Sequence, residues 1–459
     1  MERARLSQVR HKKFWTLEEA AERVGVDVNT LHKWEKGKAI PRAYNLQRLC
    51  HAYGMTAQQL GLEDEPLSED GQHIPPVKDG LTPFQQQDLT LRLIRIVGQW
   101  NHQNTRHSVL QTQITQELEH SMNEDPQAQL TRRDALRRLA LLPVELLGLS
   151  AVGVVLKHPA EDILVQCAAG ITACWHLRRG KELLFASGTV TRYLPTLKAI
   201  AHNASSTQRK AAADLLSQSY LLKGSLAWHV EGYNEAIAYT RQAAIYGEAA
   251  ENSTLQILAL RTQGAAHYYA NHWTQALHAT EQARALLETS KAPIPPLARS
   301  YVYAGLASYQ ARNELKQEAF QSLGKAHTAF FAQPPDEPAP VWIDHNRANL
   351  VLLDGMAHYH LGLQKEALDS FEQIYLDPAK SEAVRVETLL NQVMADVNRA
   401  DAKRDMEWCI DRWIQGIEGA KALQSEQRFN ESLHAYAALC AAWPSEPRIK
   451  EVRAYIAHW

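Results

Sequence analysis

The sequence YLLKGSLAWHVEGYNEAIAYTRQA, at residues 220–243, aligns with LRTQGAAHYYANHWTQALHATEQA, at residues 260–283. Apolar residues recur in both segments at three- and four-residue spacing, which predicts helices rather than strands. At an offset of forty residues the segments share a glycine, an aromatic residue and two alanines: Gly224 and Gly264, Tyr233 and Trp273, Ala236 and Ala276, and Ala243 and Ala283. Helical units that recur at a fixed period predict a repeat array, because neighbouring units must bury each other's apolar faces.

Two later segments repeat the pattern of small and large residues, at Ala319 and Ala326 and then at Gly355, Ala367, Phe371 and Pro378. These positions resemble the tetratricopeptide repeat, in which small residues let paired helices approach closely and large aromatic residues fill the gap between them. The resemblance covers roughly residues 160–440, and we assign residues 159–459 to this domain. It implies a superhelix whose concave groove binds peptides or partner helices.

The same resemblance implies which side chains line the groove, because the first helix of each repeat faces the concave side in that family. An asparagine there offers a donor and an acceptor to a peptide backbone, and an arginine can bind a carboxylate. A packing or surface role is the alternative for each position. The candidate groove residues are Ser225, Trp228, Arg261, Tyr268, Asn346, Asn349, Met356, Tyr359 and Asn391.

The chain as a whole has the composition of a folded globular protein. Its 459 residues are too many for one compact core, and 45% hydrophobic with 22% charged residues is ordinary for such proteins. Period-two alternation is nearly absent, so we predict an all-α fold. The net charge is only −2, so any affinity for nucleic acid must come from a local basic surface.

A basic surface of this kind is indicated at the N-terminus, where residues 1–62 carry eleven Lys and Arg against six Asp and Glu. Thr16 and Asp27 are candidate N-caps for two short helices, the second running from Val28 to about Lys36. The segments VGVDVNTLHKWEKGKAIPR and LQRLCHAYGMTAQQLGL, at residues 24–42 and 46–62, resemble the Xre and phage-repressor family. The resemblance implies a five-helix domain over residues 1–62 whose helix-turn-helix binds DNA.

Positions in the helix-turn-helix family imply which side chains meet the DNA, because the second helix of the motif enters the major groove. The candidate base-reading residues are Val28, Asn29, Thr30, His32 and Lys33. The candidate phosphate contacts are Lys12, Lys13, Lys36, Lys38 and Arg42. Relatives commonly carry glutamine where this chain has Leu17, which removes one expected phosphate contact. An ordinary solvated side chain is the alternative for each lysine.

Two segments separate the basic head from the repeats. Residues 63–83 are rich in acids, proline and glycine, which predicts an exposed linker. Residues 84–158 form a connector of two helices, or of one long helix with a polar middle. Its apolar stripes suit either a dimer seam or a spacer packed on the next domain, and they consist of Leu89, Leu93, Val97 and Trp100, and of Leu110, Ile114, Leu118 and Met122.

The connector ends in an apolar segment, residues 139–156, whose eighteen residues reach the lower limit for spanning a bilayer. Pro143, Glu145, Gly148 and Gly153 interrupt this segment. We therefore expect a buried core segment, with membrane attachment as the alternative.

Motifs for common catalytic and metal sites are absent from the sequence. It contains no GxxxxGK[ST], no GxGxxG after a strand, no HExxH and no GxSxG. The histidines do not show metal-ligand spacing with an acidic third ligand. The five cysteines include no CxxC pair, which favours buried thiols in a reducing cytosol. We expect no enzymatic activity, no cofactor and no metal.

A helix-turn-helix head joined to a tetratricopeptide array resembles the peptide-pheromone-sensing transcription factors of Gram-positive bacteria. The resemblance implies a cytoplasmic homodimer that binds a pseudo-palindromic operator in double-stranded DNA. Its groove would sense a small peptide, as in quorum sensing, or a partner protein. The alternative is a scaffold whose repeats recruit a partner protein to DNA without sensing a ligand.

Overall fold

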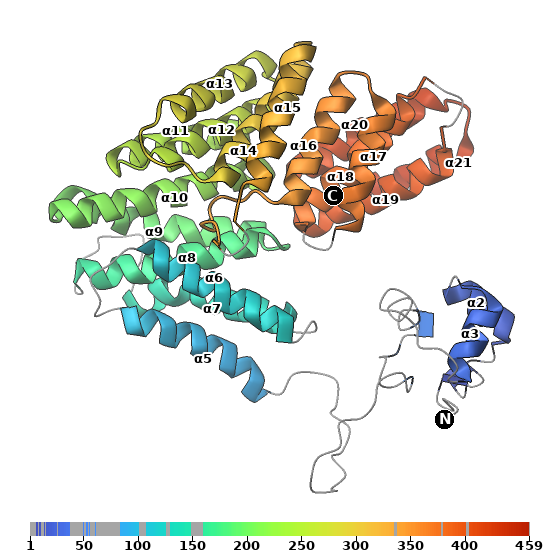
Figure 1. Ribbon diagram of the computed structural model, residues 1–459, viewed down its shortest axis with the longest axis horizontal. Helices are drawn as coiled ribbons and strands as arrows, with labels where there is room; N and C mark the ends of the chain where they lie inside the picture. The colour runs from blue at the N-terminus through green and yellow to red at the C-terminus, as the bar shows by residue number, and fades with distance from the viewer. Residues whose placement is uncertain are drawn as a thin grey trace, which may run out of the picture. The chain divides into compact units, whose positions relative to one another are not determined.

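The computed structural model is built of helices (Figure 1). The described residues are 6–7, 9–10, 13, 15–24, 26–36, 49, 52–53, 55, 60, 83–100, 107–124, 129–147, 159–334, 337–377, 380–400 and 404–458. Every regular element among them is helical, which confirms the all-α prediction. The chain divides into two compact units, Met1–Gly80 and Leu81–Trp459.

The first unit contains two described helices of the head, α2 (Leu17–Val24) and α3 (Val28–Glu35). Helix α2 follows Thr16, whose hydroxyl accepts a hydrogen bond from the Glu19 N–H while the Glu19 carboxylate accepts one from the Thr16 N–H. This reciprocal pair is a capping box. Helix α3 follows Asp27, whose carboxylate accepts a backbone N–H of the first turn at 2.8 Å. Both caps stand where the sequence predicts them.

An apolar core holds α2 against α3. Its buried members are Leu6, Ala20, Ala21, Val24, Leu31, Trp34, Leu49, Tyr53 and Leu60. Burial of these side chains removes the apolar side of α3 from water and leaves its polar side outward. The five-helix count that the family resemblance implies involves residues outside the described ones.

The second unit begins with three connector helices, α5 (Pro83–Trp100), α6 (His107–Glu124) and α7 (Gln129–Leu147). Six residues of the apolar stripes of α5 and α6 are buried in the same core as the next helix, α8 (Ala160–Arg178): Leu89, Leu93, Val97, Leu110, Ile114 and Leu118. Trp100 is partly buried against this core, and the side chain of Met122 lies outside the described ones. Helices α5 and α6 both contact α8, and the choice between a dimer seam and a spacer stays a prediction.

Helix α7 contains the first part of the apolar segment 139–156. Leu139 and Ala140 are buried in the core. Pro143 lies inside the helix, and the hydroxyl of Tyr193 donates to the nearby carbonyl of Ala140. Among the described residues, no helix combines the length and the apolar character that a bilayer crossing requires. Residues 148–158 lie outside the described residues.

The remaining helices form a curved array of successive pairs (Figure 1). After α8 they are α9 (Leu183–Asn203), α10 (Ser206–Val230), α11 (Tyr233–Ala249), α12 (Ser253–Tyr269), α13 (Trp273–Thr289), α14 (Pro296–Arg312), α15 (Lys316–Phe331), α16 (Arg347–His360), α17 (Gln364–Leu376), α18 (Glu382–Val397), α19 (Met406–Leu423), α20 (Glu426–Ala442) and α21 (Pro447–Glu451), followed by a 3-10 helix (Val452–His458).

The paired helices of the array approach each other closely at small residues. In α10, Gly224 lies so near α11 that a Cβ on this glycine would stand 2.6 Å from the Thr240 methyl. Gly264 of α12 makes the equivalent approach to Thr280 of α13. Both threonine hydroxyls also donate to the carbonyl four residues earlier in their own helix. The forty-residue repeat in the sequence is therefore a structural repeat.

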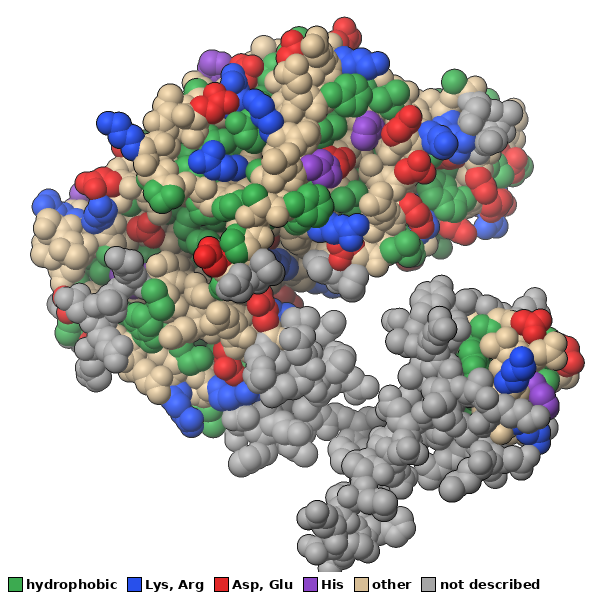
Figure 2. Space-filling model, viewed as in Figure 1, with side chains coloured by type: hydrophobic (Ala, Val, Ile, Leu, Met, Phe, Trp, Pro, Cys, Tyr) green, Lys and Arg blue, Asp and Glu red, His purple; other side chains and the backbone are tan. Residues whose placement is uncertain are grey.

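The array curves until its late helices contact its early ones. Arg178, at the end of α8, pairs with Asp344, which precedes α16. The N–H of Glu382, at the start of α18, donates to the carbonyl of Arg179 at 3.2 Å. Helix α20 packs against α10. The face of the array turned to the viewer in Figure 2 mixes charged and apolar side chains.

We expect Gly264→Ala to destabilise the array by about 1–3 kcal/mol, because the new methyl overlaps the stiff Thr280 side chain and lies 3.0 Å from the Ala276 carbonyl. Gly324→Ala in α15 is the matched control, since a Cβ there meets nothing within 4 Å. That change should stabilise by about 0.5–1 kcal/mol. Urea unfolding followed by far-UV circular dichroism measures both. Equal midpoints for the two variants would contradict close packing at Gly264.

Candidate DNA-binding helix and ligand groove

Helix α3 presents its predicted base-reading side chains to solvent. Asn29, His32 and Lys33 are exposed, and Val28 and Thr30 are half-buried at the start of the helix. The opposite side of α3 is buried in the core of the first unit. Figure 2 shows basic and histidine side chains next to one another on the described part of this unit.

A buried ion pair holds the end of α3. The Nε of Arg10 donates to Glu35 Oε1 at 2.7 Å, and its Nη2 donates to Oε2 at 3.1 Å. Its Nη1 donates to the Trp15 carbonyl at 3.1 Å. The hydrogen bonds that Arg10 donates to Glu35 outweigh the effect of burial and raise the pKa of Arg10. This role of Arg10 is not recognisable from the sequence, because Arg10 and Glu35 lie 25 residues apart and no local spacing rule joins them.

Two of the five predicted phosphate-contacting residues are among the described residues. Lys13 and Lys36 are exposed. The Nζ of Lys13 lies 5.2 Å from the ring centroid of Trp15, and the guanidinium of Arg23 lies 4.7 Å from it. Arg23 is an exposed cation in the last turn of α2 and was not among the predicted phosphate contacts. Outside the described residues lie Lys12, Lys38 and Arg42.

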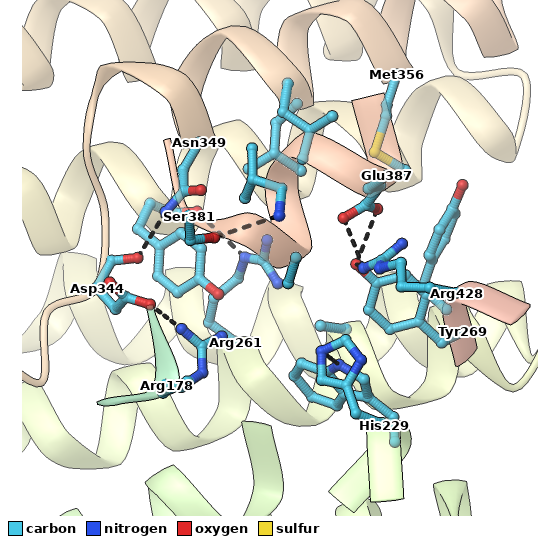
Figure 3. Close-up of a pocket in the computed structure, with 18 of the residues that line it drawn as sticks. Arg178, His229, Arg261, Tyr269, Asp344, Asn349, Met356, Ser381, Glu387 and Arg428 are labelled. Atoms are coloured by element: carbon cyan, nitrogen blue, oxygen red, sulfur yellow. Dashed lines mark hydrogen bonds and ion pairs between the residues drawn. The ribbon is translucent and has the colours of Figure 1, made fainter. Parts of the chain in front are cut away.

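Two adjoining cavities open on the inner side of the array, and Figure 3 shows the smaller one. Their volumes are about 90 and 280 Å³. They share four lining residues, Tyr268, Tyr269, Met356 and Glu387, and therefore lie next to each other. We call the two cavities together the groove. Its walls come chiefly from α10, α12, α14, α16, α18 and α20.

The structure brings seven of the nine predicted groove residues to these walls. The smaller cavity is lined by Trp228, Arg261 and Asn349, the larger by Tyr359 and Asn391, and both by Tyr268 and Met356. These residues come from α10, α12, α16 and α18, so they meet only because the array curves.

Ser225 and Asn346 line neither cavity. The hydroxyl of Ser225 donates to the Leu222 carbonyl of its own helix at 2.9 Å. The side chain of Asn346 caps α16 by accepting the Asn349 N–H at 3.0 Å. Both side chains form hydrogen bonds within their own helix or its cap. An alignment of repeats cannot distinguish such positions from positions on the groove wall.

A fully buried arginine lies in the smaller cavity between two tyrosines. The Nε of Arg261 donates to the Tyr301 carbonyl at 3.2 Å, and its Nη1 donates to the Tyr309 hydroxyl at 3.0 Å. Burial lowers the pKa of Arg261, but the phenols of Tyr309 and Tyr301 outweigh it and raise that pKa overall. Arg261 therefore stays a cation inside the groove.

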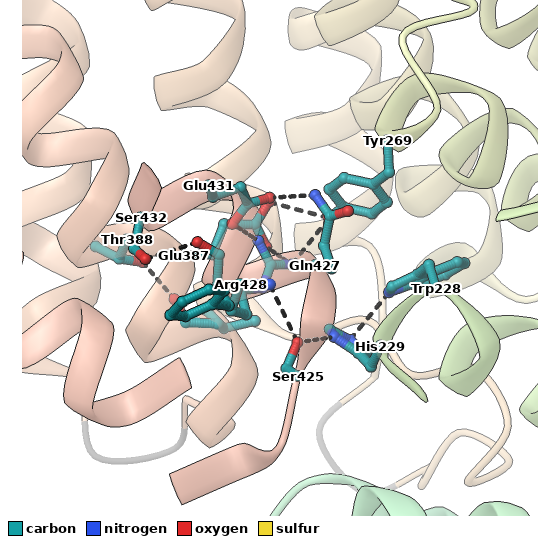
Figure 4. A network of polar contacts seen from close by, with 12 residues as sticks. Trp228, His229, Tyr269, Glu387, Thr388, Ser425, Gln427, Arg428, Glu431 and Ser432 are labelled. Atoms are coloured by element: carbon teal, nitrogen blue, oxygen red, sulfur yellow. Dashed lines mark hydrogen bonds and ion pairs between the residues drawn. The ribbon is translucent and has the colours of Figure 1, made fainter. Parts of the chain in front are cut away.

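A second buried cation joins late helices to an early one (Figure 4). The Nη2 of Arg428, on α20, lies 2.7 Å from Glu387 Oε2 on α18 and donates to the Tyr269 hydroxyl on α12 at 3.2 Å. Its Nη1 pairs with Glu431. The Tyr269 hydroxyl in turn donates to Glu387 Oε1 at 3.0 Å. Burial lowers the pKa of Arg428, whereas the two carboxylates prevail and raise it.

A buried histidine bridges α10 and α20 beside this network (Figure 4). The Nε1 of Trp228 donates to His229 Nε2 at 2.9 Å, and His229 Nδ1 lies 2.7 Å from Ser425 Oγ. Because an indole N–H only donates, Nε2 must accept, so Nδ1 carries the proton and donates to Ser425. Burial, together with Arg428 and Arg178, lowers the pKa of His229 well below its usual value. The ring is neutral in this arrangement.

The groove offers binding chemistry from residues that the sequence analysis missed. Tyr269, Tyr301 and Tyr309 supply rings and hydroxyls, and Glu387 and Arg428 supply paired charges. No local pattern could have named them, since Arg428 contacts Tyr269 from 159 residues away. Within the described residues, no group of three or more His, Cys, Asp or Glu side chains is placed to hold a metal ion.

We expect His229→Gln to make the array less sensitive to acid, because glutamine can accept from Trp228 and donate to Ser425 but does not titrate. The folded-state pKa of His229 lies below the unfolded value of 6.5, so its contribution to stability is present above pH 6.5 and is lost as pH falls. The loss is about 1.4 kcal/mol per pH unit below 6.5. Urea unfolding at about pH 7.5 and about pH 5.5 tests this.

The exposed His278 provides the control, and His278→Gln should leave the pH dependence as it is in the wild type. An unchanged difference between the two pH values in His229→Gln would show that His229 does not couple the α10–α20 contact to protonation.

Comparison with known proteins identifies the first unit. Residues 6–60 match the helix-turn-helix family model, which supports DNA binding by this part of the chain. No curated protein matches the chain. Solved structures that match include the crystal structure of Scc4 in complex with Scc2n, with a TM-score of 0.33 and 12% identity over 95% of this chain and 79% of that chain. The chain carries an Xre-type helix-turn-helix domain at its N-terminus, followed by a long array of helical repeats.

Proposed function

We propose that the chain is a sequence-specific DNA-binding transcriptional regulator whose array binds a short peptide and thereby controls the arrangement of its DNA-binding heads. The observation that carries this proposal is the helix-turn-helix match over residues 6–60, joined to an exposed polar face on α3. The groove, with its aromatic and charged walls, supports the sensing half of the proposal.

On DNA, α3 lies in the major groove with its first turn at the base edges. Asn29 pairs with adenine through its amide, Lys33 donates to guanine, and Val28 contacts a thymine methyl. Lys36 binds a phosphate and fixes the register of the helix. The buried Arg10 keeps α3 from shifting, because its carboxylate partner sits at the end of that helix.

A short peptide suits the groove better than a folded partner. The groove is lined by helices from early and late parts of the array, and its cavities of about 90 and 280 Å³ suit a small ligand rather than a folded protein surface. The paired helices resemble tetratricopeptide repeats, whose concave faces bind such ligands. Asn391 and Tyr359 present polar groups to the larger cavity, where a peptide backbone needs hydrogen-bond partners.

The regulator works as a homodimer in the cytoplasm, with one head on each half of a pseudo-palindromic operator. A ligand shifts the arrangement of the heads only by its differential affinity for two states of the protein. A quorum-sensing peptide is the type of ligand that the family resemblance implies. No catalytic step, cofactor or metal is part of the proposal.

We expect Asn29→Ala to lower affinity for the selected operator by ~1–3 kcal/mol and to relax base preference at one position, because the amide reads a base edge. Lys36→Ala should weaken all duplexes alike and reduce the salt dependence of binding by ~1 in slope. Fluorescence anisotropy with operators selected from random duplexes measures both. Salt-independent binding, or equal effects of the two changes on every sequence, would contradict the assigned roles.

Ligand coupling is tested on the same operator. We expect peptides that bind the groove to change operator affinity by about 5- to 150-fold, the usual range of coupling between two sites. Calorimetry identifies binding peptides, and anisotropy then compares operator affinity with and without them. Peptide binding that leaves operator affinity unchanged would contradict ligand sensing. Recovery of a stoichiometric protein partner, with no effect of any peptide, would favour the scaffold.

A further inference from the structure

The described carboxylates that line the groove form ion pairs with only two of its four described arginines. The described walls carry Arg178, Arg261, Arg312 and Arg428, and Asp344, Glu387 and Glu431. Asp344 pairs with Arg178, and both glutamates pair with Arg428. The described carboxylates form no ion pair with Arg261 or Arg312, whose guanidinium groups lie against aromatic rings instead. Positive charge is therefore in excess on the α12–α14 side of the groove.

Arg261 is the deeper of these two arginines. It is 2% exposed, and its guanidinium carbon lies 4.3 Å from the ring centroid of Tyr301 and 5.3 Å from that of Tyr309. A guanidinium has five N–H donors. Among the described residues two of them are used, by the Tyr301 carbonyl and the Tyr309 hydroxyl, which leaves three for another acceptor.

The fold makes room for this cation with a glycine on α14. A Cβ on Gly305 would stand 2.6 Å from Arg261 Nη2 and nearer still to Nε. Any larger residue at this position would force the guanidinium out of its place between the tyrosines. A buried charge without a counter-ion is costly, and buried unpaired charges are typical of binding sites. In Figure 3, Arg261 lies between the Arg178–Asp344 pair and the Glu387–Arg428 pair.

We propose that the groove recognises its ligand through an oxyanion, a carboxylate or a phosphate, that Arg261 binds. The inference rests on the proposed function, in which the groove holds a small ligand, and it names the chemistry that selects this ligand. The oxyanion supplies the counter-charge and accepts the free N–H groups. Away from water, such a charge-assisted hydrogen bond is stronger than at an exposed site. Trp228 and Met356 then contact the apolar remainder of the ligand.

The full-length protein is tested with two short-peptide libraries that lack Asp and Glu. One library has free C-terminal carboxylates and the other has C-terminal amides, so they differ only in the oxyanion. Peptides retained with the protein on size exclusion are counted by mass spectrometry. We expect the free acids to be retained roughly 10- to 100-fold better, as for loss of one hydrogen bond to a charged group. A third arm measures the thermal midpoint in inorganic phosphate against chloride at equal ionic strength.

Two variants and one control locate the effect. Arg261→Gln should abolish the preference for free acids, and Gly305→Ala should weaken it because the guanidinium is displaced while the charge remains. Arg284→Gln removes a half-buried arginine of α13 that pairs with Glu288 outside the groove, and this variant should bind as the wild type does. Circular dichroism of each variant checks that the array is folded, and the comparison of acids with amides on the wild type is decisive without the variants.

Each outcome separates this inference from the proposed function. Retention of free acids that Arg261→Gln abolishes supports both. If phosphate stabilises the wild type but not Arg261→Gln, and no peptide is retained, the result supports the oxyanion site with a phosphate-bearing ligand and excludes the proposed peptide ligand. Equal retention of acids and amides overturns the oxyanion and leaves peptide sensing standing. If no peptide is retained and phosphate does not change the thermal midpoint, both the oxyanion site and peptide sensing are contradicted.

Discussion

Close approach between helices at glycine is the constraint on which the array depends. At Gly224, Gly264 and Gly355 the partner helix lies where a Cβ would otherwise be, against a threonine or, at Gly355, the ring of Phe371. Helices that pack at this distance leave little freedom in their crossing angle, so successive pairs stack in a regular curve. The curve brings α18 and α20 round to α10 and α12, and the groove exists because of that return.

Where early and late helices meet, buried ion pairs and hydrogen bonds join them. Arg428 with Glu387, and Arg178 with Asp344, bury charges that must be matched, because breaking a buried pair leaves an expensive lone ion. Such contacts add little net stability compared with apolar packing, but they are selective in geometry. They specify one closed arrangement, and they place polar groups on the wall of the groove. Arg261 is the exception, because it pairs with no described carboxylate and donates hydrogen bonds to Tyr301 and Tyr309 instead.

The first unit relies on few contacts, as small domains do. Trp34 fills its core from α3, and Arg10 holds the last turn of the same helix through two hydrogen bonds to Glu35. The exposed face of α3 is thereby held in place by buried residues. A DNA-reading surface needs such support, because a small shift of the helix would misplace every side chain that it offers to a base edge.

The sequence by itself determined the local features of this protein. Thr16 and Asp27 were recognisable as caps, and helical periodicity with matched small residues predicted an all-α repeat array, since these signals act over a few residues. Exposure of Asn29 followed from the same reasoning. The tertiary structure alone decided that Arg261 would stand among tyrosines and that Arg428 would meet Tyr269. Those contacts join residues far apart in the chain. The residues are brought together by the curvature that accumulates over many helix pairs, and no local sequence pattern encodes this curvature.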